Sequence, residues 1–383
     1  MYYYYFVNVK IETGPIRPPS ESHSLLFRFS RNCPWNKCLF CPVYKGEKFS
    51  LRPLQEIKNE ITYLSSLHKK IKELLSKFTI YELSLSLNNF FSSSEVYDAK
   101  RILHWLYHGE YTVFIQDADP LLRKKGEIFE LLHLLKSEFP EIQRITTYAR
   151  AKTINRYEIS DLKEFQKSGL SRIHLGLESG SKEVLNFVCK GLEPLDIIKA
   201  CEKLNQASIE TSLYVMPGLG GKALSTIHIN ETIHVINLSN PNFLRLRTIG
   251  LNPYMPLYKL YKEGLFTPPS EKMIVLEIKE LIEGIQTHLK LYSDHNLNLL
   301  MEINGQLPDD REHMLKKIER FLALDDERAN LFILARRLNK VFELNEFFAV
   351  PPDNELLNIY EKIKNLSHEE RENLFLDLRS QNL

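Results

Sequence analysis

Between residues 24 and 253, short apolar runs that suit β-strands alternate with longer stretches whose apolar residues recur at helical spacing. Strands that alternate with helices predict a parallel sheet with right-handed crossover connections. The chain offers about six such units, fewer than the eight of a closed barrel. We therefore expect an α/β fold, a partial (β/α)6 barrel of the TIM type, followed by a helical C-terminal region. The six predicted strands cover residues 24–31, 112–115, 144–148, 172–177, 209–215 and 243–249.

The length and the charge of the chain limit its domain organisation and its possible partners. Its 383 residues, 43% of them apolar, suffice for one large core or for a barrel with a smaller domain. We expect an extension over residues 1–23, the barrel over 24–265 and the helical region over 266–383. Fifty lysines and arginines balance 49 aspartates and glutamates, so no overall field attracts DNA or an anionic membrane. No targeting segment or run of about 20 apolar residues is present, and we expect a cytoplasmic protein without a membrane or DNA partner.

Three of the five cysteines, Cys33, Cys38 and Cys41, lie within nine residues and follow the first predicted strand. The odd count and this clustering argue against a disulfide framework. Three close thiolates can bind three irons of a [4Fe-4S] cluster, whereas electron-carrying clusters usually have a thiolate on every iron. The cysteines therefore indicate an iron–sulfur cluster with one iron left open for a substrate.

Other interpretations of these cysteines remain open. A zinc site needs a fourth Cys or His ligand at a recognisable spacing, and His23 is the only candidate nearby. An iron–sulfur electron carrier or sensor would use the same thiols without turnover. A zinc-stabilised nucleic-acid module would show a basic face with aromatic platforms, which the balanced charge does not favour. Cys189 and Cys201 lie in helical patterns, where cysteine usually behaves as a small buried side chain.

The CxxxxCxxC motif, with Phe40 before its last cysteine, resembles the motif of the radical S-adenosylmethionine (SAM) superfamily. The likeness is to the group that shares the elongator, methylthiotransferase and nitrogenase-cofactor type of core. The usual pattern is CxxxCxxC, one residue shorter in its first interval. The resemblance implies that Cys33, Cys38 and Cys41 hold a [4Fe-4S] cluster and that Phe40 lies against the adenine of SAM. It also implies an enzyme that cleaves SAM reductively to a 5′-deoxyadenosyl radical, with flavodoxin or ferredoxin as reductant and a small molecule or RNA as substrate.

The resemblance extends to two later strand ends. Asp117 stands after the second strand, where the superfamily often has a Gly-Gly-Glu turn that this sequence lacks. Asp117 or Asp119 can supply the acceptor for the amino group of SAM, and solvated turn aspartates are the alternative. Glu178 and Ser181, in the segment HLGLESGS, resemble residues that reach the ribose or methionine part of SAM. Ser181 also stands where a helix N-cap is expected, and the two roles are compatible.

Gly218 and Arg245 complete the set of expected SAM ligands. Gly218, in the segment MPGLGG, resembles a position where the backbone passes close to adenine, which glycine permits because it has no Cβ.

The alternation of side chains along a strand places Arg245 and Arg247 on one face of the sixth strand. Facing inward, Arg245 can bind the SAM carboxylate or an anionic substrate, and facing outward it would form surface ion pairs. We favour the inward orientation. The residue that handles the substrate stays unknown.

Two features narrow the reaction class. The cysteines begin too early for a preceding cobalamin domain, and no C-terminal cysteines are present for auxiliary clusters. We therefore expect neither cobalamin-dependent methyl transfer nor auxiliary-cluster peptide modification. Ser293, Asp294, His295 and Asn298 form a compact polar set, for which we expect the role of a helix cap, with closure over the substrate as the alternative.

Overall fold

The computed structural model describes residues 9 and 11–381, which divide into two compact units. The first unit comprises Met1–Pro34, Gly46–His174 and Lys203–Glu210, as far as these are described. The second comprises Trp35–Lys45, Leu175–Glu202 and the described part of Thr211–Leu383. Each unit is built around part of a mostly parallel sheet.

The first unit contains the strands β1, β4 and β5 and the helices that cover them. Its elements are η1 (Pro19–Glu21), β1 (Leu25–Arg28), β2 (Ser30–Arg31), β3 (Ser50–Leu51), α1 (Leu54–Leu75), α2 (Ile80–Ser86), η2 (Leu87–Asn89), α3 (Val96–His108), β4 (Thr112–Gln116), η3 (Pro120–Leu122), α4 (Lys125–Glu138), β5 (Arg144–Ala149), α5 (Ala151–Ile154) and α6 (Ile159–Lys167).

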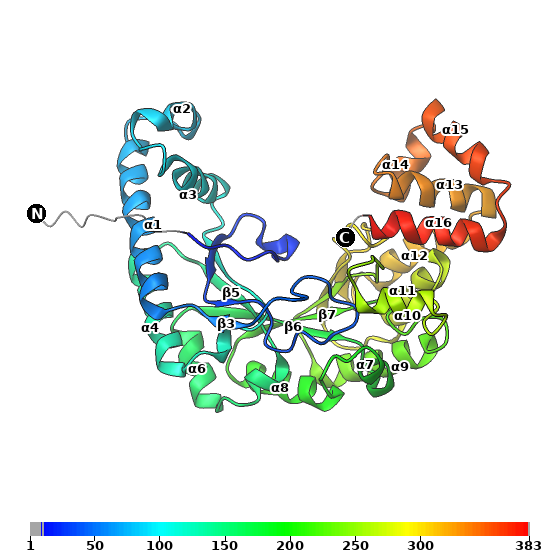
Figure 1. The fold of residues 1–383 in the computed structure, drawn as a ribbon, viewed down its shortest axis with the longest axis horizontal. Coiled ribbons are helices and arrows are strands. Elements are labelled where there is room, and N and C mark those ends of the chain that lie inside the picture. The colour runs from blue at the N-terminus through cyan, green and yellow to red at the C-terminus, as the bar shows by residue number, and fades with distance from the viewer. Residues whose placement is uncertain (1–8, 10, 382–383) are drawn as a thin grey trace, which may run out of the picture. The chain divides into compact units, whose positions relative to one another are not determined.

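Apolar spacing explains these elements. Strands β1, β4 and β5 pair in parallel, and every residue of β4 is buried, as expected for a parallel strand covered on both faces. In α1, Ile57, Ile61 and Leu64 are fully buried, because residues three or four apart share one helix face. Helix α1 packs against α3 and α4 in the first unit (Figure 1).

Three elements are divided between the units, and the first residue of strand β7 (Glu210–Val215) belongs to the first unit and the rest to the second. Strand β6 (Leu170–Glu178) begins in the first unit and ends in the second, and helix α8 (Pro194–Gln206) ends in the first. The other elements of the second unit are α7 (Lys182–Phe187), α9 (Ser225–Ser239), β8 (Phe243–Leu246), α10 (Pro256–Lys262), α11 (Glu271–Gly284), β9 (Leu289–Tyr292), β10 (Gly305–Leu307), α12 (Arg311–Leu322), α13 (Asp326–Arg337), α14 (Leu344–Ala349), α15 (Asn354–Ile363) and α16 (His368–Ser380).

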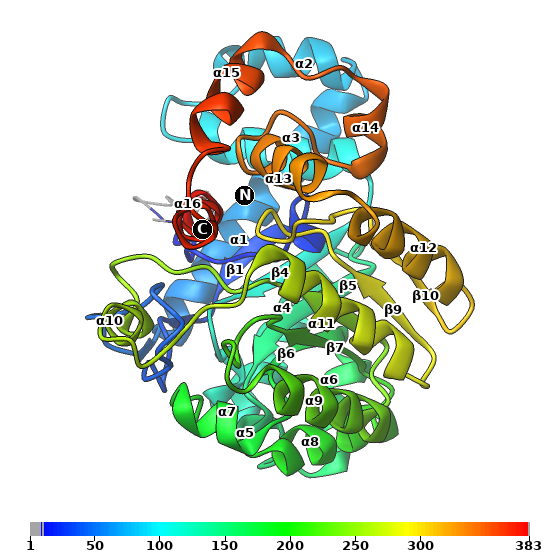
Figure 2. The same ribbon diagram turned by 90° about the vertical axis from the view of Figure 1, so that its right-hand side faces the viewer.

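The sheet of the second unit runs in the order β7-β8-β9-β10. Strands β7, β8 and β9 are parallel, and β10 pairs antiparallel with β9. Leu213, Leu244 and Leu291 are neighbours across these strands and are fully buried. Helix α11 packs against α9 and α12, as Figure 2 shows, and α13 packs against α15 and α16.

The fold class is confirmed: the chain is α/β with a mostly parallel sheet and a helical C-terminal region, and all six predicted strands are present. The C-terminal region also contains β9 and β10, which the sequence analysis missed. Strand β9 has only four residues, too few for a clear alternation signal among helical neighbours. The expected domain boundaries stay a prediction. Among the described residues, every helix is too short or too polar to span a lipid bilayer.

Candidate functional site

The loop that carries Cys33, Cys38 and Cys41 joins the short strands β2 and β3. These strands pair antiparallel, Ser30 with Leu51 and Arg31 with Ser50, so they close the base of the loop. All three cysteines are half-buried. Cys33 belongs to the first unit, whereas Cys38 and Cys41 belong to the second. The cysteines thus follow the first strands of the sheet, as predicted.

Asp117, just beyond β4, supports the residue that precedes Cys33. Its buried carboxylate accepts hydrogen bonds from Arg28 Nε at 2.5 Å and from the backbone N–H of Asn32 at 3.0 Å. Asp117 has a φ of 80°, in the left-handed region that aspartate tolerates better than most residues. Asn32 Nδ2 donates to the backbone carbonyl of Lys48 at 2.7 Å. Asp117 therefore positions Asn32, and its contact with the amino group of SAM stays a prediction.

Two buried arginines fix the strands at the base of the loop. Arg52, which follows β3, donates from Nη1 to the carbonyl of Arg28 and to Glu60 Oε2, each at 2.8 Å. Arg123 Nη1 donates to the carbonyls of Phe29 at 2.9 Å and of Arg52 at 2.8 Å. Guanidinium groups therefore hold both sides of the loop base within the first unit.

Asp119, two residues beyond Asp117, is also fully buried. Its Oδ2 accepts a hydrogen bond from Thr153 Oγ1 at 2.6 Å, and within the described part of the chain Oδ1 has no hydrogen-bond partner. Burial raises the pKa of Asp119 to about 7, because a charged carboxylate is poorly solvated there. Asp119 can therefore hold a proton near neutral pH.

In the second unit, backbone hydrogen bonds clamp the loop on both sides of Leu39. The N–H of Leu39 donates to the carbonyl of Val188 at 2.9 Å, and its carbonyl accepts from the N–H of Leu257 at 2.9 Å. Cys38 and Cys41 lie within two residues of Leu39 in the chain. The clamp therefore fixes the backbone that carries these two cysteines.

Trp35 provides a second attachment of the loop in this unit. Its Nε1 donates to the backbone carbonyl of Cys189 at 2.7 Å. Its indole ring lies over Gly191, where a Cβ would collide with ring atoms. Gly191 also has a φ of 64°, which glycine adopts without strain. Trp35 therefore requires glycine at position 191.

Phe40 belongs to a buried apolar cluster that we call the Phe40 wall. Phe40 itself is 7% exposed, and Cys38 and Cys41 pack against the wall. The wall keeps water from one side of these two cysteines, because apolar contacts leave no space for it. Contact between Phe40 and adenine stays a prediction. The wall consists of Phe40, Val184, Val188, Met216, Leu219, Ile249, Leu251, Met255, Leu257, Phe266 and Leu376.

Glu178 ends β6 and forms an ion pair that the sequence analysis missed. Lys190 Nζ lies 2.9 Å from Glu178 Oε1 and 5.6 Å from the centre of the Phe40 ring. A Cβ at Gly176 would collide with Glu178 Oε1 and crowd Lys190 Nζ, so glycine leaves room for this pair. The backbone of Glu178 has a φ of 63°, and its carbonyl accepts from the N–H of Met216 at 2.9 Å. Glu178, Lys190 and Phe40 therefore form one local group in the second unit.

A buried hydrogen-bond network attaches the residues that follow Glu178 to helix α9. His228 Nε2 donates to the carbonyl of Met216 at 3.2 Å, so its Nδ1 accepts from the hydroxyl of Ser179 at 2.8 Å. Burial lowers the pKa of His228 to about 4, which keeps the ring neutral. The N–H of Gly180 donates to Thr232 Oγ1 at 2.7 Å. This network limits movement of the segment that carries Glu178.

Ser181 is the N-cap of helix α7. Its fully buried hydroxyl accepts from the backbone N–H of Val184 at 3.5 Å. The capping role expected from the sequence is therefore confirmed. Contact between Ser181 and SAM stays a prediction.

Gly218, beyond the end of β7, has a φ of 86° and lies close to neighbouring side chains. A Cβ at this position would lie 2.7 Å from Ile249 Cγ2. The N–H of Gly218 donates to Glu277 Oε2 at 2.5 Å, and Glu277 Oε1 accepts from Ser225 Oγ at 2.5 Å. Burial raises the pKa of Glu277 to about 7. Glycine is therefore required here for both φ and space.

Arg245 is 3% exposed, so its side chain is buried rather than displayed on the surface. Its Nη1 lies 2.9 Å from Asp294 Oδ2, and its guanidinium lies 4.6 Å from the centre of the Tyr292 ring. Within the part of the chain that the structure describes, Arg245 Nε has no hydrogen-bond partner. Arg247 is only half-buried. One donor of Arg245 is thus left for an anionic group, and the SAM carboxylate stays the predicted one.

The polar set from Ser293 to Asn298 follows strand β9, so its expected role as a helix cap is wrong. Asn298 instead supports the end of β8. Its Oδ1 accepts from the backbone N–H and the hydroxyl of Thr248, each at 2.9 Å, and its Nδ2 donates to the carbonyl of Leu246 at 2.8 Å.

The two remaining cysteines differ in burial. Cys201 is fully buried, as expected, and burial raises the pKa of its thiol to about 12. The expectation of burial is wrong for Cys189, which is exposed at a φ of 53°. Cys189 lies just beyond α7, where the backbone has left the helix.

The side chains described above fit an iron–sulfur cluster and SAM. Three half-buried thiols on one loop are the donor set that a cluster with one open iron needs. Arg245 Nε, buried and without a partner in the described residues, suits a carboxylate. Glu178 provides an acceptor for hydroxyl or ammonium groups near Phe40.

Similarity to known proteins covers the middle of the chain. Residues 89–229 match the family model of the radical SAM superfamily. This stretch contains Glu178, Ser181 and Gly218 and begins after the three cysteines.

Two curated relatives and one solved structure are also similar. The tRNA uridine(34) acetyltransferases of Methanocaldococcus infernus and Methanocaldococcus jannaschii are 27% and 26% identical to this chain over 117 residues, 29% of this chain and 21% of each relative. The chain thus spans about a fifth of their length. The structure of archaeal Methanocaldococcus infernus Elp3 with an N-terminal deletion aligns with a TM-score of 0.43 and 18% identity, over 58% of this chain and 57% of that one.

The family match lies on the alternating helices and strands from α3 into α9, and the three cysteines precede it in the chain. The chain thus contains a stretch, residues 89–229, that matches the radical SAM superfamily.

Proposed function

We propose that this chain cleaves SAM reductively with a [4Fe-4S] cluster held by Cys33, Cys38 and Cys41. When bound, the cluster and SAM supply one-electron cleavage of a sulfur–carbon bond, which yields methionine and a 5′-deoxyadenosyl radical that removes a hydrogen atom from the substrate. The observation that carries the proposal is the clamp on Leu39. It fixes the backbone between Cys38 and Cys41 against the Phe40 wall, in a chain whose residues 89–229 match the radical SAM superfamily.

In this proposal the side chains near Phe40 orient SAM. Phe40 offers a flat apolar surface for adenine. Glu178 accepts hydrogen bonds from ribose hydroxyls or from the ammonium group of the methionine part, and Lys190 fixes the direction of its carboxylate through the 2.9 Å ion pair. Arg245 binds the carboxylate of SAM through its free Nε–H, while Asp294 holds the guanidinium in place at 2.9 Å.

The reaction needs an external one-electron donor, for which we propose a flavodoxin or ferredoxin. For the substrate we propose RNA, with a small molecule as the alternative. The two named tRNA uridine(34) acetyltransferases support tRNA as the first RNA to test. The similarity covers about a fifth of those proteins, so acetyl transfer is not part of the proposal.

Anaerobic reconstitution with iron and sulfide, followed by reduction with and without SAM, tests the proposal. We expect about four irons per chain and SAM-dependent release of both 5′-deoxyadenosine and methionine, measured by mass spectrometry. Incubation with transfer RNA, followed by nucleoside mass spectrometry, tests the RNA substrate separately.

Variants separate the proposed cluster ligands from other thiols. Cys38→Ala should lose the cluster and the release of 5′-deoxyadenosine. Cys189→Ala is the matched control, because Cys189 is exposed and contributes to the site only through its backbone carbonyl. A reducible cluster that releases neither product, and whose spectrum SAM does not change, would establish an electron carrier or sensor instead.

A further inference from the structure

Three histidines of the first unit gather at one place that the proposed function does not use. His104 and His108 lie four residues apart at the C-terminal end of α3, so they share one face of the helix. His23 lies in the segment just before β1. One ring nitrogen from each of the three lies within 4.8 Å of the other two.

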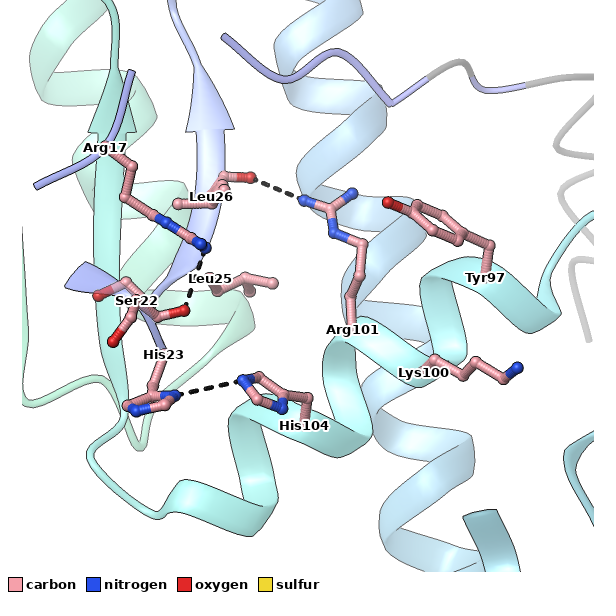
Figure 3. A pocket seen from close by; sticks show the side chains of 10 residues that line it. Arg17, Ser22, His23, Leu25, Leu26, Tyr97, Lys100, Arg101 and His104 are labelled. Atoms are coloured by element: carbon pink, nitrogen blue, oxygen red, sulfur yellow. Dashed lines mark hydrogen bonds between the residues drawn. The ribbon is translucent and has the colours of Figure 1, made fainter. Parts of the chain in front are cut away.

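Distances between the rings match those of shared ligands. His23 Nδ1 and His104 Nε2 are 3.3 Å apart (Figure 3). Two imidazole nitrogens at about 2.0 to 2.1 Å from one tetrahedral zinc ion lie about 3.3 to 3.4 Å apart. The ring of His108 stacks on that of His23 with centroids 3.5 Å apart. The half-buried His108 ring would have to turn out of this stack for its nitrogen to join the other two on one ion.

We propose that His23, His104 and His108 form a binding site for a divalent transition metal ion of the zinc type. Imidazole nitrogens are preferred ligands of zinc, nickel and copper, whereas magnesium and calcium prefer oxygen ligands. The i, i+4 pair on α3 supplies two ligands from one rigid element, and His23 supplies the third from the segment that leads into β1. A bound ion would tie the end of α3 to the start of β1.

The surroundings decide what completes the coordination. Arg17, Lys100 and Arg101 line the adjoining pocket, and Figure 3 shows them around His23 and His104. No aspartate or glutamate is among the residues that line this pocket. The fourth position is therefore left to water or a small anion, as in metal sites that keep one position open. The same cations weaken the binding of a dication, so we expect a moderate affinity.

Zinc titration of the reduced full-length chain, followed by calorimetry under anaerobic conditions, tests the site. Removal of a ligand should weaken binding by more than the 10- to 100-fold seen for outer-shell changes. We expect the double variant His104→Gln/His108→Gln to lose one zinc equivalent, while any zinc held by the cysteines remains. His234→Gln/His313→Gln is the matched control, since both of these histidines are exposed and lie on other helices.

A second measurement keeps the inference testable if the double variant folds poorly. Added zinc should raise the unfolding temperature of the wild-type chain, and the single variant His108→Gln should lose most of this rise. Equal zinc stoichiometry and equal stabilisation in wild type, histidine variants and control would overturn the proposal. Binding of inorganic phosphate with no histidine-dependent zinc binding would also overturn it and would identify the pocket as an anion site.

Discussion

The two sides of the cysteine loop are held by different kinds of contact. In the first unit, charged groups fix the backbone next to Cys33. In the second unit, backbone hydrogen bonds and apolar packing fix the segment around Leu39. In the first unit, Asp117 accepts from Arg28 and from the N–H of Asn32, and Arg28 also pairs with Glu12 at 2.8 Å. In the second, Leu39 is bonded on both sides and Phe40 is buried.

This difference has a consequence for how each side responds to change. A buried ion pair loses much of its stabilisation when one partner is removed, because the other charge is left without compensation. Apolar packing responds to volume and shape instead. Charge-neutralising substitutions should therefore affect the Cys33 side most, and steric substitutions the Leu39 side.

The largest effect is expected from Asp117→Asn. The variant keeps the shape of the side chain but leaves Arg28 with one acidic partner fewer in a buried place, so we expect a loss of about 3 to 5 kcal/mol in the free energy of unfolding. Denaturant unfolding measures this loss, and iron bound per chain after reconstitution should fall with it.

Glu130→Gln is the matched control for Asp117→Asn. Glu130 pairs with Lys58 on exposed parts of α4 and α1, at 2.5 Å, and surface pairs contribute less than about 1 kcal/mol. Equal losses in the two variants would show that the Arg28–Asp117 pair does not hold the Cys33 side of the loop.

A pH dependence of similar or smaller size comes from buried carboxyl groups, Asp119 and Glu60 in the first unit and Glu277 in the second. Burial raises the pKa of both Asp119 and Glu277 to about 7. In the unfolded chain these groups titrate near 4, so the folded state binds more protons between about pH 4 and pH 7. The free energy of unfolding should therefore fall as pH rises through this window, by up to about 3 to 4 kcal/mol for each group.

Neutral variants assign this pH dependence to one unit or the other. Asp119→Asn should remove its own share of the dependence in the first unit and leave the share of Glu60, whose pKa burial also raises to about 7. Glu277→Gln should remove the part from the second, because a glutamine does not titrate and its amide oxygen can still accept from the backbone N–H of Gly218. Unfolding curves at pH 5 and pH 7 measure both. A pH dependence that neither substitution reduces would contradict the raised pKa values of Asp119 and Glu277.

Much of the fold was predictable because its signals are local. Strand β4 is a run of buried residues, and α1 repeats its apolar positions at helical spacing. Strand β9 was missed because four residues with one exposed lysine carry little pattern. Its place in the sheet depends on pairing with β8, which no local signal encodes.

In the candidate site, too, some residues are marked by a local signal in the sequence and others are not. A motif marks the three cysteines and Phe40, and a strand end marks Glu178. Their supports lie far along the chain: Lys190 is 12 residues from Glu178, and Glu277 is 59 residues from Gly218. A lysine, a histidine or a glutamate within an amphipathic helix or loop looks like any surface residue in the sequence, and only tertiary packing turns it into a partner.

The smallest effect is expected from Gly191→Ala, which tests the apolar packing of Trp35 in the second unit. An alanine pays about 1 to 2 kcal/mol for a left-handed conformation wherever it is placed. Gly264→Ala is the matched control, because Gly264 has a similar φ of 74° but no atom within 4 Å of the point where a Cβ would lie. At position 191 the methyl group would also meet the indole of Trp35, and such overpacking costs about 1 to 3 kcal/mol more. The difference between the two variants in the free energy of unfolding therefore isolates the Trp35 contact.

We expect Gly191→Ala to be less stable than Gly264→Ala by that amount and to retain less iron, because a displaced Trp35 loosens the segment that carries Cys38 and Cys41. If both variants lose the same stability and bind the same iron, the strain of the backbone is the whole effect, and the Leu39 clamp alone holds this side of the loop.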